Sequence, residues 1–407
     1  MSKNEEIAQR AIVLWLSGIE LEEISAIPEV EMIMQRGAIV ELDSLPITGP
    51  VAQNYQVFSG RSPASFGFFD TLVPHDYSVV EESGGRGVNP KLFPDFIRTV
   101  GWTVKYEEKQ FSELSNCIEH WIQSVPSSST CLIVKCVLET PFDSMPLVQA
   151  LQLAQSWLGE TGLVALLSDT HPAFVKSFVN INNFLAEMGI LTRKEHDGHI
   201  DWSNSLAYFA GHGQLWINLL GRDPQGVVHP REEYEEVRDS LIKGLPTKLR
   251  DVETPVIERV YRKEELYSSE YLFCLPDLIV VFKPGYAPSP QSTHLGFDTE
   301  VCTALSNKRQ ASAGVHPSAV KGFLIVSGPG LVQGQSLTET SPLTSVVPTL
   351  LHALGVDYVD LETSAISELF STTYLQKHPI RSSMHDQELS EEDEERIINH
   401  LRDLGYV

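Results

Sequence analysis

The chain has 407 residues, of which 42% are hydrophobic and 21% are charged, a composition typical of a globular protein with a large core. Its formal net charge is −24 and its sequence pI is about 4.9. Such a field repels a phosphate backbone, so we expect no binding of nucleic-acid polymers. A small anionic ligand is not excluded, because a metal or a local basic pocket can reverse the field.

Two further features bear on where the protein acts. The N-terminal segment MSKNEEIAQR is polar and acidic, and it lacks the basic start and apolar stretch of a signal peptide. No apolar run approaches the roughly 20 residues that span a bilayer. The five cysteines have no CxxC spacing, which argues against a disulfide framework or a thiolate zinc site. We therefore expect a cytoplasmic protein that makes no contact with a membrane.

In chain order, short apolar runs alternate with amphipathic stretches, and this pattern predicts a doubly wound α/β sheet. The runs that we interpret as buried parallel strands are AIVLWL (11–16), TCLIVKCVL (130–138), GLVALL (162–167) and GFLIVSG (322–328). Apolar residues at helical spacing predict helices over 148–162, which ends in a glycine, and over 178–191.

The middle of the chain has a different pattern. Residues 205–285 begin with an alternation typical of antiparallel strands and continue through turn residues at 221–226. An amphipathic helix is predicted over 232–245, with a glycine near its end. We interpret 205–285 as a small α+β insertion, or cap, in a core that is formed by residues 1–204 and 286–407.

Two more segments complete the predicted organisation. Residues 285–320 are rich in Gly, Pro, Ser and Asn and are predicted to form a long loop that returns to the core. Residues 390–407 predict an acidic amphipathic helix, with Ser390 as its N-cap. This helix and the acidic surface are the features that a protein partner would bind.

Polar side chains stand at the ends of the predicted strands. They are Ser17, Glu139, Asp143, Asp169, His171 and, before the last strand, His316. Strand ends of an α/β sheet converge on one edge, where carboxylates and an imidazole could bind a divalent metal. Each residue also has a structural interpretation: Asp169 as a helix N-cap, the two residues after the second strand as a solvated pair, and His316 as a surface residue.

The chain resembles the alkaline phosphatase superfamily, and in particular its type I phosphodiesterase/nucleotide pyrophosphatase branch. The segments that carry the resemblance are AIVLWLSG, LPITGPVAQNYQVFSGRSPASFGFFD, INLLGRDPQGVV, PDLIVVFKPGY, SAGVHPSAVKGFLIVSGPGL and SVVPTLLHALGV. The resemblance implies an α/β/α sandwich with a mostly parallel central sheet and a small α+β cap. It also implies two metals at the C-terminal edge of the sheet, which activate a Ser or Thr nucleophile and neutralise the transferring group.

The first of these metal sites is damaged in this chain. The family's Asp after the first strand falls on Ser17, and its Asp-His pair falls on Asp169-Thr170, with His171 one position late. The nucleophile falls on or near Pro50, and proline cannot attack phosphorus. Thr48 and Ser59 are the nearest hydroxyls.

The second site keeps ligand-type residues. The resemblance places Glu139, Asp143 and His316 there, and Asp169 completes a set that could hold one divalent metal: Zn, Mn or Mg. A metal-free site is the alternative. The histidine that follows the family's nucleophile region falls on Phe66.

Further candidates line the pocket or contact an anion. Arg61, His75 and Ser59 are predicted to bind substrate, and Arg222 and Lys321 are additional candidate anion contacts.

Three functions follow from these assignments. The first is a repurposed enzyme that acts on a phosphate or sulfate ester without a protein nucleophile, by elimination or by attack from within the substrate, with Asp169, His171 and His316 as acid–base groups. The second is a divergent metal-dependent phosphodiesterase or phosphatase that uses Thr48, Ser59 or a metal-bound water. The third is a non-catalytic binding or scaffolding protein.

Overall fold

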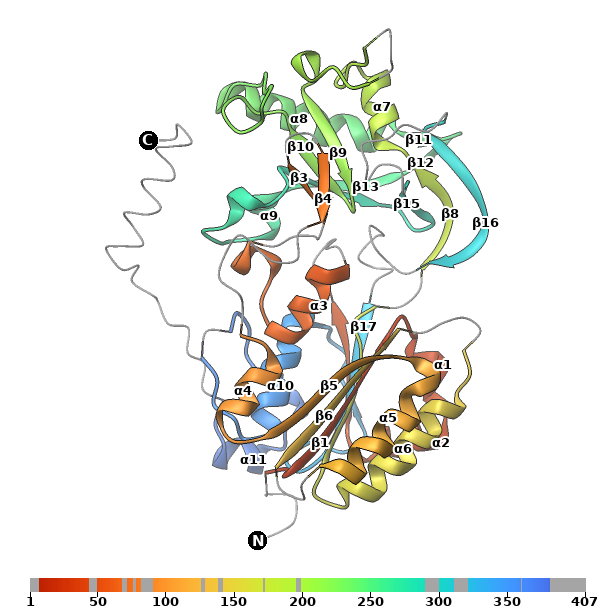
Figure 1. Cartoon of the computed structure of the whole chain (residues 1–407), viewed down its shortest axis with the longest axis vertical. Coiled ribbons are helices and arrows are strands. Elements are labelled where there is room, and N and C mark those ends of the chain that lie inside the picture. Colours follow the sequence, from red (N-terminus) through yellow and green to blue (C-terminus); the bar gives the residue numbers. More distant parts are fainter. Residues whose placement is uncertain are drawn as a thin grey trace, which may run out of the picture.

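The apolar runs form the largest sheet of the computed structural model (Figure 1). The structure describes residues 7–43, 50–67, 72–75, 78–81, 91–125, 129–137, 142–170, 173–194, 199–289, 300–310, 321–359 and 361–380. In spatial order the strands are β18 (Gln335–Ser336), β2 (Ala38–Asp43), β17 (Lys321–Ser327), β7 (Leu163–Ser168), β1 (Arg10–Ser17), β6 (Thr130–Val137) and β5 (Thr103–Gln110), and β19 (Ser341–Pro342) also pairs with β2. The protein is therefore a mixed α/β protein with a curled sheet of mostly parallel strands.

Helices cover both faces of this sheet because its strands are apolar on both sides. In β1, Ala11, Val13 and Trp15 pack on one face, and the intervening residues pack on the other. The helices on the Trp15 face are α3 (Pro50–Ser59), α4 (Phe93–Thr99), α10 (Val346–Ala353) and α11 (Thr372–Lys377). Those on the opposite face are α1 (Leu21–Ser25), α2 (Pro28–Arg36), α5 (Leu114–Ser124) and α6 (Met145–Leu158).

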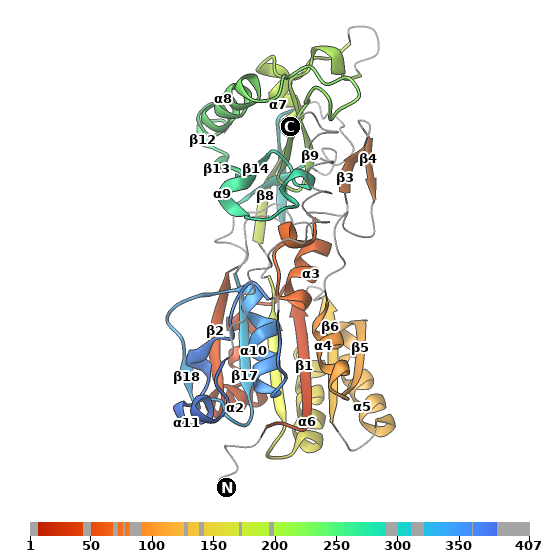
Figure 2. The same ribbon diagram turned by 90° about the vertical axis from the view of Figure 1, so that its left-hand side faces the viewer.

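A second group of sheets lies beyond one end of the large sheet, with α3 between them (Figures 1 and 2). Its four-stranded antiparallel sheet has the order β13 (Ile257–Arg262), β14 (Leu278–Phe282), β10 (Gln214–Ile217) and β9 (Ala207–Gly211). A three-stranded sheet has the order β15 (Tyr286–Pro288), β8 (Ala173–Val179) and β16 (Cys302–Gln310). In the described residues, two separate two-stranded sheets are formed by β3 (Leu72–His75) with β4 (Ser78–Glu81) and by β11 (Arg250–Asp251) with β12 (Thr254–Pro255).

Three further α-helices belong to this group: α7 (Ile181–Glu187), α8 (Glu232–Lys248) and α9 (Lys263–Leu266). The described residues also form short 3-10 helices: η2 (Pro63–Phe66), η3 (Phe111–Glu113), η4 (Trp202–Asn204), η5 (Leu272–Cys274), η8 (Leu343–Ser345) and η9 (Ser367–Leu369). The turn after α3 touches the second group directly, because the Ser269 hydroxyl donates to the carbonyl oxygen of Ala64 at 2.8 Å.

The direction of the last strand was predicted wrongly. β17 is antiparallel to both of its neighbours, β7 and β2, although it was predicted to be parallel. An unbroken apolar run indicates burial on both faces of a sheet, and it carries no information about strand direction.

One predicted helix is confirmed with a later start, and one loop prediction is wrong. The helix expected over 178–191 begins only at Ile181, because 173–179 forms β8 and the side chain of Asn180 caps the helix by accepting the Asn183 N–H at 3.1 Å. The expected loop over 285–320 contains β15 and β16, which pair with the two edges of β8. Both edges of β8 were available for pairing, and composition alone does not reveal which segments pair with them.

The two other predicted helices are confirmed with shifted ends. The helix expected over 148–162 is α6, which stops at Gly159 with φ of +65°. The helix expected over 232–245 is α8, which continues past Gly244 to Lys248. Gly244 does not end the helix, and a Cβ there would lie 3.0 Å from the methyl group of Met188, a tight contact that this flexible side chain can relieve.

The division into a core and an insertion at 205–285 stays a prediction. In the structure, Val179, Ile181 and Leu185 pack in the same hydrophobic cluster as Phe209 and Phe282, so residues before 205 contribute to the core of the second group of sheets.

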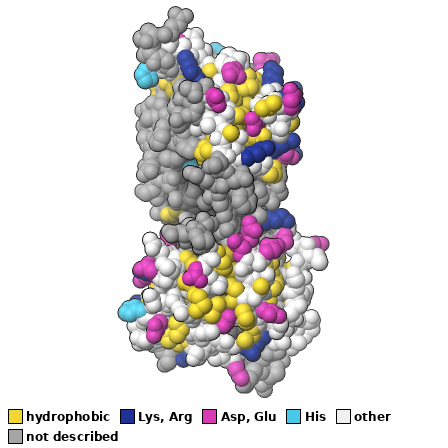
Figure 3. All heavy atoms as spheres, turned by 90° about the vertical axis from the view of Figure 1, so that its right-hand side faces the viewer, with side chains coloured by type: hydrophobic (Ala, Val, Ile, Leu, Met, Phe, Trp, Pro, Cys, Tyr) yellow, Lys and Arg dark blue, Asp and Glu magenta, His cyan; other side chains and the backbone are white. Residues whose placement is uncertain are grey.

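Acidic, basic and apolar side chains are mixed on the face shown in Figure 3. Figure 3 shows acidic side chains spread over both halves of one face, with apolar side chains gathered between them in the half that holds the large sheet. In the part of the chain that the structure describes, no helix combines the length and the apolarity needed to cross a membrane.

Candidate functional site

The edge at which β1 and β7 end brings Ser17 and Asp169 together. These strands are parallel, and Trp15 lies opposite Leu167; two residues further on, the same register sets Ser17 opposite Asp169. The segments that follow β1 and β7 are joined by a backbone hydrogen bond, which the Gly18 N–H donates to the Thr170 carbonyl at 3.1 Å. The hydroxyl of Ser168 adds a donor, 2.6 Å from the Thr170 carbonyl. These hydrogen bonds hold the ends of the two strands together.

Asp169 is a buried carboxyl group at this edge, with an exposed fraction of only 2%. Burial raises its pKa above the ordinary value, and interactions with Trp15, Ser17 and the ammonium group of Lys135 offset that rise only in part. A carboxyl group in this state holds its proton more firmly than one in water. It can therefore serve as a proton donor as well as an acceptor.

A row of side chains below Asp169 supplies its environment. Trp15, Lys135 and Glu108 are paired neighbours on β1, β6 and β5, and they share the face that α3 covers. The ammonium of Lys135 lies 4.9 Å from the centre of the Trp15 ring and 3.2 Å from Oε1 of Glu108. The phenol of Tyr106 donates to the same oxygen at 2.7 Å.

The charges in this row are unequally buried. Lys135 is 5% exposed, whereas 58% of the Glu108 side chain is accessible to solvent. Burial by itself would raise the pKa of Glu108, but the Tyr106 hydroxyl and the Lys135 ammonium hold it below the ordinary value. Water screens the Glu108 carboxylate more than the Lys135 ammonium. The positive charge of Lys135 is therefore the less screened of the two inside the fold.

Helix α3 closes the row from above. Phe58 makes edge-to-face contacts with Trp15 at 4.8 Å and with Tyr106 at 5.0 Å between ring centres. The aromatic packing fixes the helix over the strand ends. The C-terminal half of α3, with Val57 and Phe58, therefore packs on the Trp15 face of the large sheet, and Pro50, which the resemblance assigns to the nucleophile, is the first residue of this helix.

Ser59 and Arg61 lie at the other end of α3. The Ser59 hydroxyl is buried and accepts the Arg61 N–H at 3.2 Å. The charge of Arg61 acts on Glu362, a carboxylate that also accepts the Ser62 N–H at 2.9 Å. Burial raises the pKa of Glu362, and the contacts with Ser62 and Arg61 counter that rise. These interactions give both predicted residues a local structural role.

The remaining predicted site residues are only partly covered by the structure. Thr48, Glu139, His171 and His316 lie outside the described residues. His75 is the last residue of β3, and its side chain is not described.

Asp143 is exposed, and its Oδ1 accepts the Met145 N–H at 3.0 Å where α6 begins, which is the contact of an Asx turn before the helix. Within the described ranges, no group of three or more His, Cys, Asp or Glu side chains is arranged to hold a metal ion. The metal site predicted from the sequence has two of its four ligands outside those ranges, so it stays a prediction.

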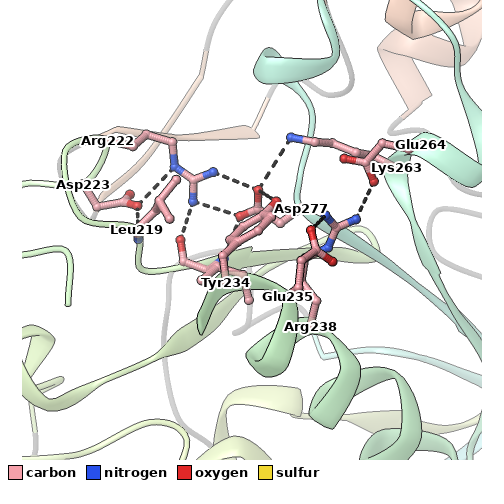
Figure 4. A network of polar contacts seen from close by, with 10 residues as sticks. Leu219, Arg222, Asp223, Tyr234, Glu235, Arg238, Lys263, Glu264 and Asp277 are labelled. Atoms are coloured by element: carbon pink, nitrogen blue, oxygen red, sulfur yellow. Dashed lines mark hydrogen bonds and ion pairs between the residues drawn. The ribbon is translucent and has the colours of Figure 1, made fainter. Parts of the chain in front are cut away.

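A second buried charge cluster surrounds Asp277, beside β14 and α8 (Figure 4). Arg222 donates to both carboxylate oxygens of Asp277 at 2.9 Å, and the Tyr234 hydroxyl donates at 2.8 Å. The Ile217 N–H donates at 2.8 Å, and the Lys263 ammonium lies at 3.6 Å. These cations and donors outweigh the effect of burial and hold the pKa of Asp277 well below its usual range. Arg222 also pairs with Asp223 at 3.1 Å.

This cluster and Lys135 were not identified from the sequence. Arg222 was proposed as an anion contact, but its guanidinium is engaged with Asp277 and Asp223. Lys321, the other proposed contact, is exposed and pairs with Glu41 at 3.0 Å. The signal for Lys135 was its place in TCLIVKCVL, where a lysine interrupts an apolar run that forms a central strand.

Comparison with models of known protein families finds none that matches the chain, and comparison with curated protein sequences finds no match either.

Proposed function

We propose that the protein is a divergent member of the alkaline phosphatase superfamily that acts on a small phosphate or sulfate ester without a protein nucleophile. The curled, mostly parallel sheet and the sequence segments quoted above support the assignment to this superfamily, with its α/β/α sandwich. The replacement of the family's first-strand Asp by Ser17, and of its nucleophile position by Pro50, argues against a covalent phospho-enzyme.

The observation that carries the proposal is Asp169, a buried carboxyl group at the C-terminal edge of the sheet, opposite Ser17 and near Lys135. Because its pKa is raised, Asp169 can donate a proton to the oxygen of a departing group. In an elimination, the C–O bond to the sulfate or phosphate breaks as a base removes a proton from the neighbouring carbon. In an intramolecular displacement, a hydroxyl of the substrate attacks the phosphorus or sulfur atom and loses its proton to water, the P–O or S–O bond to the alcohol breaks, and Asp169 protonates the alcohol that leaves.

The predicted metal fits the described residues poorly. Asp143 accepts the Met145 N–H at the start of α6, and the positive charge of Lys135 acts on Asp169, where it would oppose a divalent cation. No step of the proposed reaction therefore depends on a metal. Elemental analysis of protein purified without chelator, with His316→Ala in parallel, tests the predicted cofactor. One equivalent that is lost in the variant would place a Zn, Mn or Mg ion at Glu139, Asp143, Asp169 and His316.

The reaction itself is tested with a panel of phosphate and sulfate esters, including some that carry an internal hydroxyl, in water labelled with heavy oxygen. Hydrolysis puts the label into the released phosphate or sulfate, whereas elimination and intramolecular displacement do not. We expect unlabelled product from the native protein and a loss of about 100-fold or more in kcat for Asp169→Asn. Asp239 is a half-exposed aspartate paired with Arg262, and Asp239→Asn is the matched control that should keep full activity.

The other outcomes identify the alternatives. Labelled product together with bound metal would replace the proposal with a metal-dependent phosphodiesterase or phosphatase. A protein that neither binds nor converts any ester would be a non-catalytic binding protein, and the acidic surface and the segment 390–407 would then be the first places to look for a partner.

A further inference from the structure

The strand β5 forms one edge of the large sheet, at the right-hand side of that sheet in Figure 2. Its 8 residues, TVKYEEKQ, pair with β6 in one unbroken parallel register. Within the described ranges, no strand pairs with the other side of β5. An edge strand pairs readily with another chain unless it is very short, is interrupted by a bulge or a proline, or carries charges that oppose pairing. β5 is neither short nor interrupted, so its charges decide the matter.

The other edge strands that the structure describes are shorter or interrupted. At the opposite edge of the same sheet, β18 and β19 have 2 residues each, and β19 ends in Pro342. The pairings of β9, β13 and β16 with their neighbours each contain a register shift, and β15 has 3 residues. The strands of the two-stranded sheets have at most 4 residues. Among the described sheets, β5 is therefore the edge strand that is both long and regular.

The pairing with β6 determines which backbone groups of β5 face its open edge. The Thr103 N–H donates to the carbonyl oxygen of Ser129 at 2.9 Å, so the backbone of Thr103 points toward β6. Because this direction alternates along a strand, the N–H and C=O groups of Val104, Tyr106 and Glu108 point away from β6. A second copy related by a two-fold axis at Tyr106 would set Tyr106 opposite Tyr106, and Val104 opposite Glu108. These are hydrogen-bonded pairs of an antiparallel ladder, and together they supply about six hydrogen bonds.

The same register brings opposite charges together across the axis. Lys105 is exposed, and the Glu107 side chain is 44% exposed and pairs with Lys109 at 3.0 Å. With the axis at Tyr106, Lys105 of each copy lies directly opposite Glu107 of the other copy, an arrangement that stabilises an antiparallel pair. Moving the axis by one residue would set either Lys105 opposite Lys105 or Glu107 opposite Glu107, which is destabilising. The charges of β5 therefore oppose its neighbouring registers and favour the one that the backbone also allows.

We propose that β5 is an interaction surface for a second copy of this chain, which pairs with it antiparallel about a two-fold axis at Tyr106 and continues the large sheet. The net charge of −24 makes copies of the chain repel each other over most of their surface. The sequence TVKYEEKQ holds two lysines and two glutamates and so carries no net charge, which removes this repulsion locally. The interface consists mainly of one strand from each copy, and an interface of this small size is typical of a transient complex. We expect a Kd of about 10 to 100 μM.

The test is sedimentation velocity of the full chain from about 1 to 500 μM, in about 0.15 M salt, which screens the distant charges of the two copies. The native protein should pass from monomer to dimer over this range. Lys105→Glu and Glu107→Lys each set like charges opposite each other at both contacts, and each should weaken dimerisation about tenfold or more. An equimolar mixture of the two variants should dimerise again, because both contacts of the mixed pair join opposite charges.

Lys243→Glu is the matched control. Lys243 is an exposed residue of α8, and its substitution changes the net charge by the same amount as Lys105→Glu. It should leave the dimerisation of the native protein unchanged. A second measurement tests the register directly, with Lys105→Cys mixed with Glu107→Cys under oxidising conditions. The two positions form a non-hydrogen-bonded pair with Cα atoms about 4.5 Å apart, within the range of a disulfide. The mixture should give more disulfide-linked dimer than either variant alone.

Each outcome decides for or against this interface. A native protein that stays monomeric up to about 500 μM overturns the proposal. A dimer that Lys105→Glu and Glu107→Lys form as well as the native protein does would use another surface, which also overturns it. If both variants are monomeric and their mixture does not dimerise, the register with its axis at Tyr106 is wrong. Recovery in the mixture, together with the mixed disulfide, would establish the β5 interface.

Discussion

Two buried aspartates in this protein have opposite electrostatic environments. Asp277 is fully buried and is bound by Arg222, Tyr234 and the Ile217 N–H, with Lys263 nearby. Asp169 is almost as deeply buried, but the charge near it is a single ammonium that is shared with Glu108. The pKa of Asp277 is lowered, and the pKa of Asp169 is raised.

The surroundings of a structural carboxylate and of a candidate functional carboxyl group therefore differ in this fold. A carboxylate that ties segments together is surrounded by enough donors to keep it ionised at any physiological pH. A carboxyl group that must exchange protons needs incomplete compensation, so that both protonation states are accessible. Depth of burial alone does not separate the two cases, because both aspartates are buried.

The largest effect on the free energy of unfolding is expected at Asp277, the aspartate that is surrounded by donors. Asp277→Asn should lower the free energy of unfolding by about 3–5 kcal/mol, because Arg222 and Lys263 would keep their charges without a buried counter-ion. Urea unfolding measures this change, and Asp239→Asn at the exposed pair with Arg262 should cost less than about 1 kcal/mol. A loss at Asp277 as small as that of the control would mean that the cluster is not a buried ion-pair network.

The opposite sign is expected at Asp169. Its folded-state pKa is raised, so the folded protein binds the proton more tightly than the unfolded chain, and stability falls as the pH rises between the two values. Asp169→Asn removes this cost and should stabilise the protein by about 1 kcal/mol or more at neutral pH. The advantage should disappear as the pH is lowered toward the ordinary carboxyl value. Unfolding measured as a function of pH checks this, and a destabilised variant at neutral pH would contradict it.

A smaller effect with the reverse pH sense is expected at His352. Its ring packs against Phe370 and Tyr374, and burial, with the neighbouring charge of His378, lowers its pKa from 6.5. The unfolded chain therefore takes up the proton first, and stability falls as the pH drops below about 6.5. His352→Phe should reduce this acid sensitivity by about 1 kcal/mol or less. Equal acid sensitivity in the variant and the native protein would show that His352 does not contribute to it.

Much of the large sheet could be predicted from the sequence. The runs that form β1, β6 and β7 are apolar on both faces and end in polar residues, so their existence and their limits follow from hydrophobicity alone. The direction of β17 and the pairing of β15 and β16 with β8 could not be predicted, because they depend on which edges are open after the rest of the chain has folded.

The candidate site divides in the same way. Asp169 and Ser17 were both recognised from their places after apolar runs. Asp277 was missed because an aspartate before an apolar strand is common, and nothing in the sequence names Arg222 and Tyr234 as its partners. Lys135 was missed because strand periodicity predicts which residues share a face and says nothing about which charges meet across neighbouring strands.

By itself, the sequence determined that this chain buries a mostly parallel sheet and that acidic and polar residues stand at the ends of its strands. Apolar runs must leave water wherever they occur, so these features are local and additive. Which buried carboxyl group is surrounded by donors, and which is left with the charge of a single ammonium, depends on the tertiary structure. A pKa depends on distances between groups far apart in the chain, such as Asp169 and Lys135, and those distances exist only after the strands have paired.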